Sequence, residues 1–183
     1  MRTLLCLAAA LLCGACNERP LSPMAVAARR GEAARIAELA RGGVSPDAPS
    51  GVNDWTPLMH AIHANMSNSV EALLAAGADP NRTCCRGLSP LILAAGYGQE
   101  SNLRALLAKG ASPMHRGEDG RNALDVAIMG LSDHPGAPMG ACHADAARML
   151  LASEPRLRET PRPKRVAEAL RGCPQIQKLL AAP

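Results

Sequence analysis

The sequence contains no phenylalanine, one tryptophan and one tyrosine among its 183 residues. β-Sandwiches and β-barrels draw heavily on aromatic and β-branched side chains, so the scarcity of aromatics argues against those classes. Apolar residues still make up 48% of the chain, with much alanine and leucine, which is enough for one ordinary folded domain. Alanine and leucine favour slender helices that approach one another closely. The composition therefore indicates an all-α protein.

Signals for several functional classes are also absent. The formal charge is only +4, and no cluster of lysine and arginine is interleaved with aromatic residues, so we expect no nucleic-acid binding. The basic run at 161–165 is interpreted as the solvated start of a helix. The chain has no Gly-x-Ser-x-Gly, phosphate loop or His-Glu-x-x-His motif. We therefore expect a non-enzymatic protein with no catalytic residues and no cofactor.

Potential metal ligands occur close together at two places. His60 and His63 are three residues apart, a spacing that places them near one another on a helix. Cys142 lies beside His143 and near His134. Neither group has the ordered ligand spacing of a structural zinc site, so we expect no metal site.

The first sixteen residues, MRTLLCLAAALLCGAC, have the pattern of a secretory signal. Arg2 precedes an apolar run from Leu4 to Leu12, which is too short to span a bilayer as a helix. The end of the run resembles a bacterial lipoprotein processing site, with Cys13 where leucine is usual. The resemblance implies lipidation of Cys16 and a signal peptide at 1–15. The alternative is a soluble secreted or periplasmic protein.

The chain repeats itself at a regular interval. The triplet at 56–58 (TPL) recurs at 89–91 (SPL) and at 122–124 (NAL), and 22–24 (SPM) precedes the first at nearly the same spacing. The leucine pairs at 73–74 and 106–107 keep the same register, as do the segments at 43–47 (GVSPD), 77–81 (GADPN) and 110–114 (GASPM). A period of about 33 residues that is held by several features predicts a solenoid of stacked repeats.

In these residues the sequence resembles the ankyrin repeat family. The family signature Thr-Pro-Leu-His-x-Ala appears as TPLMHA, SPLILA, SPMAVA and NALDVA, over about residues 20–157. The usual histidine is replaced in every unit, and Asn65 stands where glycine normally ends the first helix. The resemblance implies an ankyrin repeat solenoid of about four helix-turn-helix repeats. It also implies protein binding along a concave surface, without built-in chemistry.

The residues predict the helices independently of the family. Ser22, Thr56 and Ser89 have the side-chain oxygen of a good N-cap and are each followed by proline, which is favourable at the first helical position. Gly77 and Gly110 suit helix ends that need positive φ. The inward positions of the first helices are then Leu58, Ala61, Ile62, Leu91, Ala94 and Ala95, and the second helices are expected at about 69–76 and 102–109.

The fourth unit is interrupted. The interval from Ala127 to Leu150 is nearly twice as long as the equivalent interval from Ala94 to Leu106, so an insertion lies between the two helices, around 131–143. Proline and glycine there predict a loop. The flanking helices are expected near 123–130 and 144–152, and a capping pair near 163–171 and 174–182. The predicted domain plan is a signal peptide at 1–15, a tether at 16–21, repeats at 22–157 and capping helices at 158–183.

Four cysteines remain beyond the expected leader and Cys16, which allows three full pairings. In a stack of helical hairpins, Cys142 and Cys173 occupy equivalent ends of adjacent units, so a Cys142–Cys173 disulfide is predicted. Cys84 and Cys85 lie in a turn at the opposite end of the helices. This adjacent pair can close only as a strained vicinal disulfide. Reduced, oxidised and redox-responsive states remain open, as does a turn without function.

The family's variable positions, transferred by motif register, predict a partner-binding face. Its centre is expected at Trp55, Arg86, Leu88 and Tyr97, because tryptophan, tyrosine and arginine are enriched at binding hot spots. The alternative for Trp55 is that it only covers the neighbouring hairpin. The full set is Val52, Asn53, Trp55, His63 and Ala64 in unit two, Cys85, Arg86, Leu88, Gly96 and Tyr97 in unit three, and Glu118, Asp119, Arg121 and Met129 in unit four.

The expected function is therefore a protein-interaction module. We expect it in the periplasm, anchored to the outer membrane by lipidated Cys16 because Asn17 rather than aspartate follows, and monomeric on its own. One hypothesis is an adaptor linked to envelope or oxidative stress. The alternative is an inhibitor or immunity protein that blocks a secreted enzyme or toxin. In both cases the partner is an unidentified protein, and the membrane is contacted only through the lipid.

Overall fold

A computed structural model describes residues 20–51, 54–131 and 142–181 of the chain. These ranges contain ten α-helices and two short 3-10 helices, and their only β-type pairing is a single bridge between Ser50 and Trp55. None of these helices is long and apolar enough to cross a membrane. The predicted signal peptide, Cys16 and most of the predicted insertion lie outside the described ranges.

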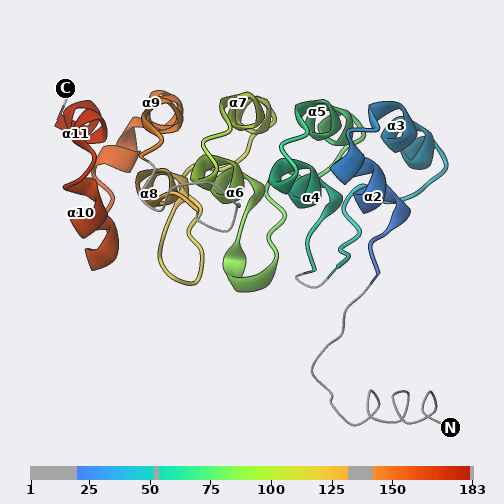
Figure 1. Cartoon of the computed structure of the whole chain (residues 1–183), viewed down its shortest axis with the longest axis horizontal. Coiled ribbons are helices and arrows are strands. Elements are labelled where there is room, and N and C mark those ends of the chain that lie inside the picture. The colour runs from blue at the N-terminus through green and yellow to red at the C-terminus, as the bar shows by residue number, and fades with distance from the viewer. Residues whose placement is uncertain (1–19, 52–53, 132–141, 182–183) are drawn as a thin grey trace, which may run out of the picture.

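The helices form two parallel layers, which lie one above the other in Figure 1. The inner layer consists of α2 (Pro23–Arg30), α4 (Pro57–His63), α6 (Pro90–Gly96), α8 (Ala123–Met129) and α10 (Lys164–Leu170). The outer layer consists of α3 (Ala33–Arg41), α5 (Ser67–Ala75), α7 (Glu100–Ala108), α9 (Ala144–Ser153) and α11 (Pro174–Ala181). The 3-10 helices are η1 (Cys85–Gly87) and η2 (Pro155–Arg158). Each helix packs against its partner and the next helix of its own layer, which confirms the all-α solenoid.

The inner helices begin where the sequence predicts. The side-chain oxygens of the three predicted N-caps accept hydrogen bonds from backbone N–H groups three residues on, which are otherwise unpaired at a helix start. Proline follows each cap at the first helical position. These bonds join Ser22 to Ala25 (3.1 Å), Thr56 to Met59 (3.3 Å) and Ser89 to Ile92 (3.3 Å).

The outer helices α5 and α7 begin two residues earlier than predicted, at Ser67 and Glu100. The cause is a left-handed residue that reverses the chain after each inner helix. Gly98 adopts φ 63° in unit three, and Asn65 adopts φ 54° in unit two, where the family has glycine. Asparagine tolerates this conformation better than other residues with a Cβ atom, so the departure at Asn65 leaves the turn intact.

The core consists mainly of small and medium aliphatic side chains between the layers. All the predicted inward positions of α4 and α6 are at most 1% exposed. Leu73 and Leu106 on the outer helices are fully buried, whereas Leu107 is only partly buried. Gly77 and Gly110 adopt φ 88° and 83° as predicted. The repeat register therefore determines which residues enter the core.

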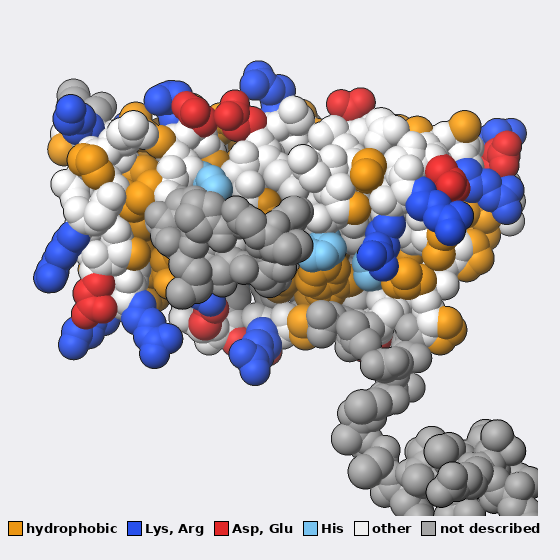
Figure 2. Space-filling view, in the orientation of Figure 1, with side chains coloured by type: hydrophobic (Ala, Val, Ile, Leu, Met, Phe, Trp, Pro, Cys, Tyr) orange, Lys and Arg blue, Asp and Glu red, His pale blue; other side chains and the backbone are white. Residues whose placement is uncertain are grey.

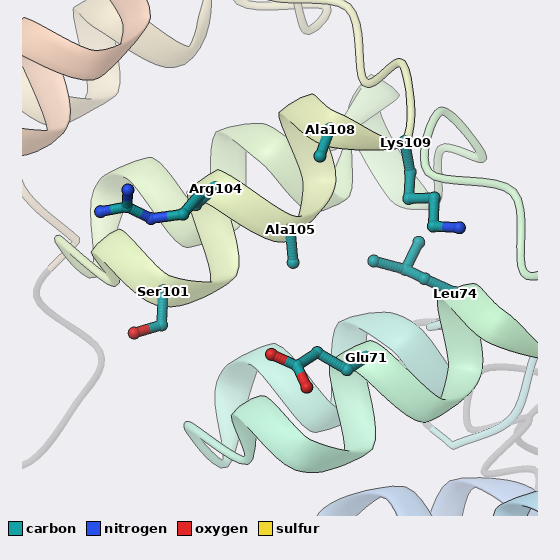
Figure 3. Close-up of a pocket in the computed structure, with 7 residues that line it drawn as sticks. All are labelled: Glu71, Leu74, Ser101, Arg104, Ala105, Ala108 and Lys109. Carbon is teal, nitrogen blue, oxygen red and sulfur yellow. The ribbon is translucent and has the colours of Figure 1, made fainter.

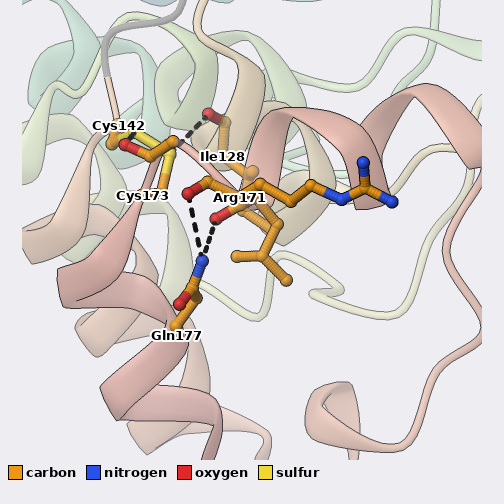
Figure 4. The surroundings of a disulfide bond; sticks show 7 residues. Ile128, Cys142, Arg171, Cys173 and Gln177 are labelled. Atoms are coloured by element: carbon orange, nitrogen blue, oxygen red, sulfur yellow. Dashed lines mark hydrogen bonds between the residues drawn. A yellow bond between two sulfur atoms is a disulfide. The ribbon is translucent and has the colours of Figure 1, made fainter.

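The predicted disulfide is present. Cys142 and Cys173 are bonded, with their Cα atoms 5.7 Å apart, and join the start of α9 to the turn between α10 and α11 (Figure 4). Next to it, the side-chain amide of Gln177 donates to the carbonyl oxygens of Leu170 and Arg171 and so closes the end of α10. A disulfide that closes a loop of this length contributes roughly 2–4 kcal/mol. It ties the last repeat to the capping pair.

A buried charge also joins the last repeat to the cap. Asp125, which replaces the family's usual histidine in unit four, has a fully buried side chain. One carboxylate oxygen lies 3.4 Å from the guanidinium of Arg116, and the other lies 3.6 Å from that of Arg162, just before α10. The carboxylate also accepts from the backbone N–H of Asn122 in a reciprocal capping box. Asp125 therefore both begins α8 and holds the chain that leads into α10.

We predict that Asp125→Ala lowers the free energy of unfolding by about 3 kcal/mol, because it leaves the largely buried Arg162 without its anion. Asp145→Ala is the matched control. Asp145 pairs with Arg148 on an exposed surface, so its removal should cost less than about 1 kcal/mol. Urea unfolding followed by circular dichroism measures both. Equal losses in the two variants would show that the buried pair has no special role.

Candidate partner-binding face

Three hairpins bring equivalent residues to one edge of the inner helices. Trp55, Leu88 and Arg121 each stand one residue before an N-cap, at the same position of successive repeats. The carbonyl oxygen of each accepts a hydrogen bond that closes its hairpin, from Ser50, Cys84 and Gly117 respectively, at 3.0 Å in every case. We call Trp55, His63, Arg86, Leu88, Tyr97 and Arg121 the hairpin face. Figure 2 shows hydrophobic and histidine side chains next to one another near the position of α4.

One end of the hairpin face is a contact of three rings from units two and three. Trp55 meets His63 edge to face, with ring centroids 5.2 Å apart. His63 lies 5.8 Å from the Tyr97 ring, and its Nδ1 atom is 2.9 Å from the Tyr97 hydroxyl oxygen. All three side chains are half-buried. The structure therefore brings three predicted binding residues together, from the hairpin before α4 and from the ends of α4 and α6.

Trp55 also packs against α4, the helix that follows it. Its ring centroid lies 5.6 Å from that of His60, and the indole contacts the edge of the core. The indole Nε1 atom is buried and has no hydrogen-bond partner among the described residues. Part of the Trp55 ring is thus structural, while the rest remains open to a partner. Its role as a hot spot stays a prediction.

The other three residues of the hairpin face line a pocket between units three and four. Arg86, Leu88 and Arg121 line a cavity of about 210 Å³. Arg86 is exposed, on the left-handed φ of 57° within η1, and no ion pair involves it within the described ranges. The remaining lining residues are Cys85, Ile92, Gly117, Asp119, Val126 and Leu131.

Arg121 is already paired within this pocket. Its Nε and NH2 atoms lie 2.8 Å and 2.5 Å from one carboxylate oxygen of Asp119. Burial alone would raise the pKa of Asp119, but the hydrogen bonds and charge of Arg121 outweigh it and lower that pKa. Arg121 is therefore held in place, whereas Arg86, which lines the same pocket, has no ion pair among the described residues. Val52 and Asn53, also predicted for this face, lie outside the described ranges.

Sequence reasoning missed how the two ends of the insertion attach to unit three. The backbone N–H of Leu131 donates to the carbonyl of Gly96 at 2.8 Å, and the Leu131 side chain covers the space where a Gly96 side chain would be. The imidazole of His143 occupies the corresponding space at Gly98. A Cβ atom at either glycine would overlap these side chains. The signal in the sequence was Gly96, which stands at a variable position one repeat before the insertion, whereas Gly98 occupies the position where the family normally has glycine.

The pKa values of two histidines near the face are lowered by their surroundings. Burial lowers the pKa of His60, and the charges of Arg29 and His63 act in the same direction. A hydrogen bond between His60 Nε2 and the Ser50 carbonyl oxygen, at 3.1 Å, opposes the shift without cancelling it. Burial likewise lowers the pKa of His143. No group of three or more His, Cys, Asp or Glu side chains within the described ranges could hold a metal ion.

A second groove lies in the outer layer, between α5 and α7 (Figure 3). Leu74, Ala105 and Ala108 supply its apolar lining, and its volume is about 330 Å³. Glu71 on α5 and Arg104 on α7 belong to its rim. No predicted binding residue lies in this groove, so its exposed Arg104 offers a control position outside the hairpin face.

Comparison with known proteins gives the family. The model described as "Ankyrin repeats (3 copies)" matches residues 2–84 and 65–160. A 2-5A-dependent ribonuclease of Mus musculus is 34% identical over 73 residues, which are 40% of this chain. The chain spans only about a tenth of the length of that relative.

We predict that the fold loses stability as the pH falls below the ordinary histidine pKa of 6.5. The pKa values of His60 and His143 are lower in the folded state, so the unfolded chain binds more protons there. The stability that the two neutral histidines contribute is therefore fully present above pH 6.5. It declines as the pH falls through their folded-state pKa values.

The test compares urea midpoints at pH 7.5 and 5.5. His60→Gln retains an N–H donor for the Ser50 carbonyl but has no proton to gain, so its midpoint should fall less than that of the unmodified chain. The His60→Gln/His143→Gln double variant should fall least. An equal decline in all three proteins would contradict the prediction.

Proposed function

Because the chain belongs to the ankyrin repeat family, we propose that it is a non-enzymatic module that binds a protein partner through the hairpin face. Ankyrin repeats suggest protein–protein interaction, and the partner's identity is open. The finer proposal is an adaptor in the bacterial envelope, linked to envelope or oxidative stress. We choose this surface because predicted binding residues from three successive repeats lie along one edge of the inner helices.

The chemistry of the face indicates the kind of partner it would accept. At one end, Trp55 and Tyr97 offer large, rigid and partly exposed rings, which contribute much contact area at little entropic cost. At the other end, Leu88 lies in a pocket that Arg86 also lines, and no ion pair involves Arg86 among the described residues. The arrangement suits a protein segment that presents apolar side chains with a carboxylate near one end.

We predict that Trp55→Ala weakens partner binding by about 2 kcal/mol, which is about 30-fold in Kd. The mature chain is immobilised, envelope extract is passed over it, and recovered proteins are quantified by mass spectrometry. Because part of Trp55 is structural, Tyr97→Phe and Arg86→Asn are tested beside it. The first removes only the hydroxyl that contacts His63, and the second removes the charge with a residue that tolerates positive φ.

Arg104→Ala is the matched control, since it removes an exposed arginine from the outer groove. A partner captured equally by the unmodified chain and by all three hairpin-face variants would show that another surface binds it. Loss of capture by Arg104→Ala alone would have the same meaning. Circular dichroism on each variant separates loss of binding from loss of the fold.

The adaptor and inhibitor hypotheses differ in what binding does to the partner. An adaptor leaves the activity of a captured enzyme intact, whereas an inhibitor or immunity protein abolishes it. The activity of the captured partner, measured with increasing amounts of the chain, therefore separates the two. No feature of the hairpin face favours the inhibitor hypothesis over the adaptor.

We further propose that the chain is periplasmic and held at the outer membrane by lipidated Cys16. The lipoprotein-like N-terminal pattern supports this location, and so does the Cys142–Cys173 bond, since disulfides persist in oxidising compartments. We predict that Cys16→Ser moves the chain out of the detergent phase on phase separation of cells, while Cys13→Ser stays in it. Retention of Cys16→Ser in the detergent phase would contradict lipidation.

A further inference from the structure

Two thiols stand next to each other at the tip of the unit-three hairpin. The Sγ atoms of Cys84 and Cys85 are 3.5 Å apart, and neither cysteine belongs to the disulfide. Cys85 is exposed and lines the pocket of the hairpin face, whereas Cys84 is half-buried. The hairpin therefore presents one accessible sulfur, with a second sulfur directly behind it.

The half-buried thiol of the pair resists ionisation. Burial raises the pKa of the Cys84 thiol to about 12, and the neighbouring Cys85 adds to the shift through a hydrogen bond and through charge. Cys84 thus keeps its proton at neutral pH. Since the thiolate is the nucleophile in disulfide exchange, the exposed Cys85 is the sulfur that attacks first.

The arrangement fits redox chemistry better than metal binding. Zinc and similar ions need about four ligands, and no group of three or more ligating side chains exists in the described part of the chain. The same chain also holds the Cys142–Cys173 disulfide, a bond that persists under oxidising conditions. Under those conditions an exposed thiol beside a second thiol can react with small disulfide-containing molecules.

The pair lies at a short turn whose backbone can adjust when the two sulfur atoms approach each other. A disulfide bond is about 2.0 Å long, so the two Sγ atoms must approach by about 1.5 Å. Cys85 and Arg86 lie in the three-residue turn η1, and Arg86 and Gly87 both adopt positive φ. Cys84 packs against the edge of the core, whereas Cys85 is exposed in this turn, so the approach of the two sulfurs mainly requires Cys85 to move.

We propose that Cys84 and Cys85 form a redox-active dithiol that reduces low-molecular-weight disulfides of the oxidised-glutathione class. The Cys85 thiolate attacks one sulfur of the reagent, whose S–S bond breaks, and one thiolate leaves and takes up a proton. Cys84 then gives its proton to solvent and attacks Cys85 Sγ. The bond from Cys85 to the reagent breaks, and the second thiolate leaves and is protonated in turn. The pair loses two electrons and two protons, and the reagent gains both.

The second step becomes easier once the first has occurred. In the mixed disulfide, Cys85 no longer carries the charge that helps to raise the pKa of Cys84. The Cys84 thiol can then ionise more readily next to its target. The product, a strained disulfide between adjacent residues, is readily reduced, so the reaction is reversible. This inference goes beyond partner binding and does not depend on it.

The experiment uses the full folded chain with its Cys142–Cys173 bond intact. The chain is incubated with excess oxidised glutathione, free thiols are blocked with N-ethylmaleimide, and the protein is digested with trypsin. Both sulfurs fall in the single peptide 83–86, because cleavage occurs after Arg82 and Arg86. We expect this peptide to be two hydrogen masses lighter than the dithiol form and without maleimide. The unmodified chain should release two more molecules of reduced glutathione than a Cys84→Ser/Cys85→Ser double variant, which corrects for the cysteines at 6, 13 and 16.

Two matched variants separate the roles of the sulfurs. Cys84→Ser should stop at a stable mixed disulfide on Cys85, with one glutathione added, because no second thiol can displace it. Cys85→Ser should react about tenfold more slowly, because burial, the largest cause of the raised pKa of Cys84, remains in this variant and the half-buried sulfur is less accessible to the reagent. Circular dichroism confirms that both variants keep the fold.

Two results would overturn the inference. One is a mixed disulfide that persists on the unmodified chain, with no intramolecular bond in the peptide 83–86. The other is an equal reaction rate for Cys84→Ser and Cys85→Ser. The measurements report the chemical state of the two sulfurs. These outcomes are therefore independent of whether the hairpin face captures a partner.

Discussion

Each helix pair of this protein relies on its neighbours to bury its apolar faces. The helices are two or three turns long, a length that is marginal in water for an isolated helix. Their buried positions carry mostly alanine, leucine and isoleucine, which give close approach but little area per residue. The stack therefore holds together only as an array, in which stability comes from the contacts between successive units. This dependence explains why helix starts, turns and core positions are kept in strict register.

An array of this kind has exposed ends, and the C-terminal end is closed by polar and covalent contacts as well as by packing. Asp125 lies between two arginines, one before α8 and one before α10, and the disulfide joins α9 to the cap from the other side. The two devices act on different layers, since α8 and α10 are inner helices while α9 and α11 are outer ones. The capping pair is consequently fixed to both layers of the last repeat.

Periodic features were the predictable part of this structure. The N-caps at Thr56 and Ser89, the C-cap glycines and the disulfide followed from spacing, because register alone determines them. The starts of α5 and α7 did not, because they depend on how tightly Asn65 and Gly98 turn the chain. The contact of Trp55 with His63 and Tyr97 also needed the structure, since repeat spacing places residues on a face without giving ring orientation. The role of Asp125 depends on Arg162, which lies outside the repeat pattern.

Gly96 and Gly98 belong to unit three, but the space beside each of them is filled by a side chain of unit four. They leave room for Leu131 and His143, the residues that flank the insertion in the next unit. A larger side chain at either glycine would displace an end of the insertion, and loss of the insertion would leave an uncovered hollow on unit three. Gly98 is needed for the turn after α6 in any case, because it adopts positive φ. Among related sequences, the insertion and Gly96 should therefore be gained and lost together, although they belong to different repeats. The side chain that position 96 can carry is thus limited by the repeat that follows it.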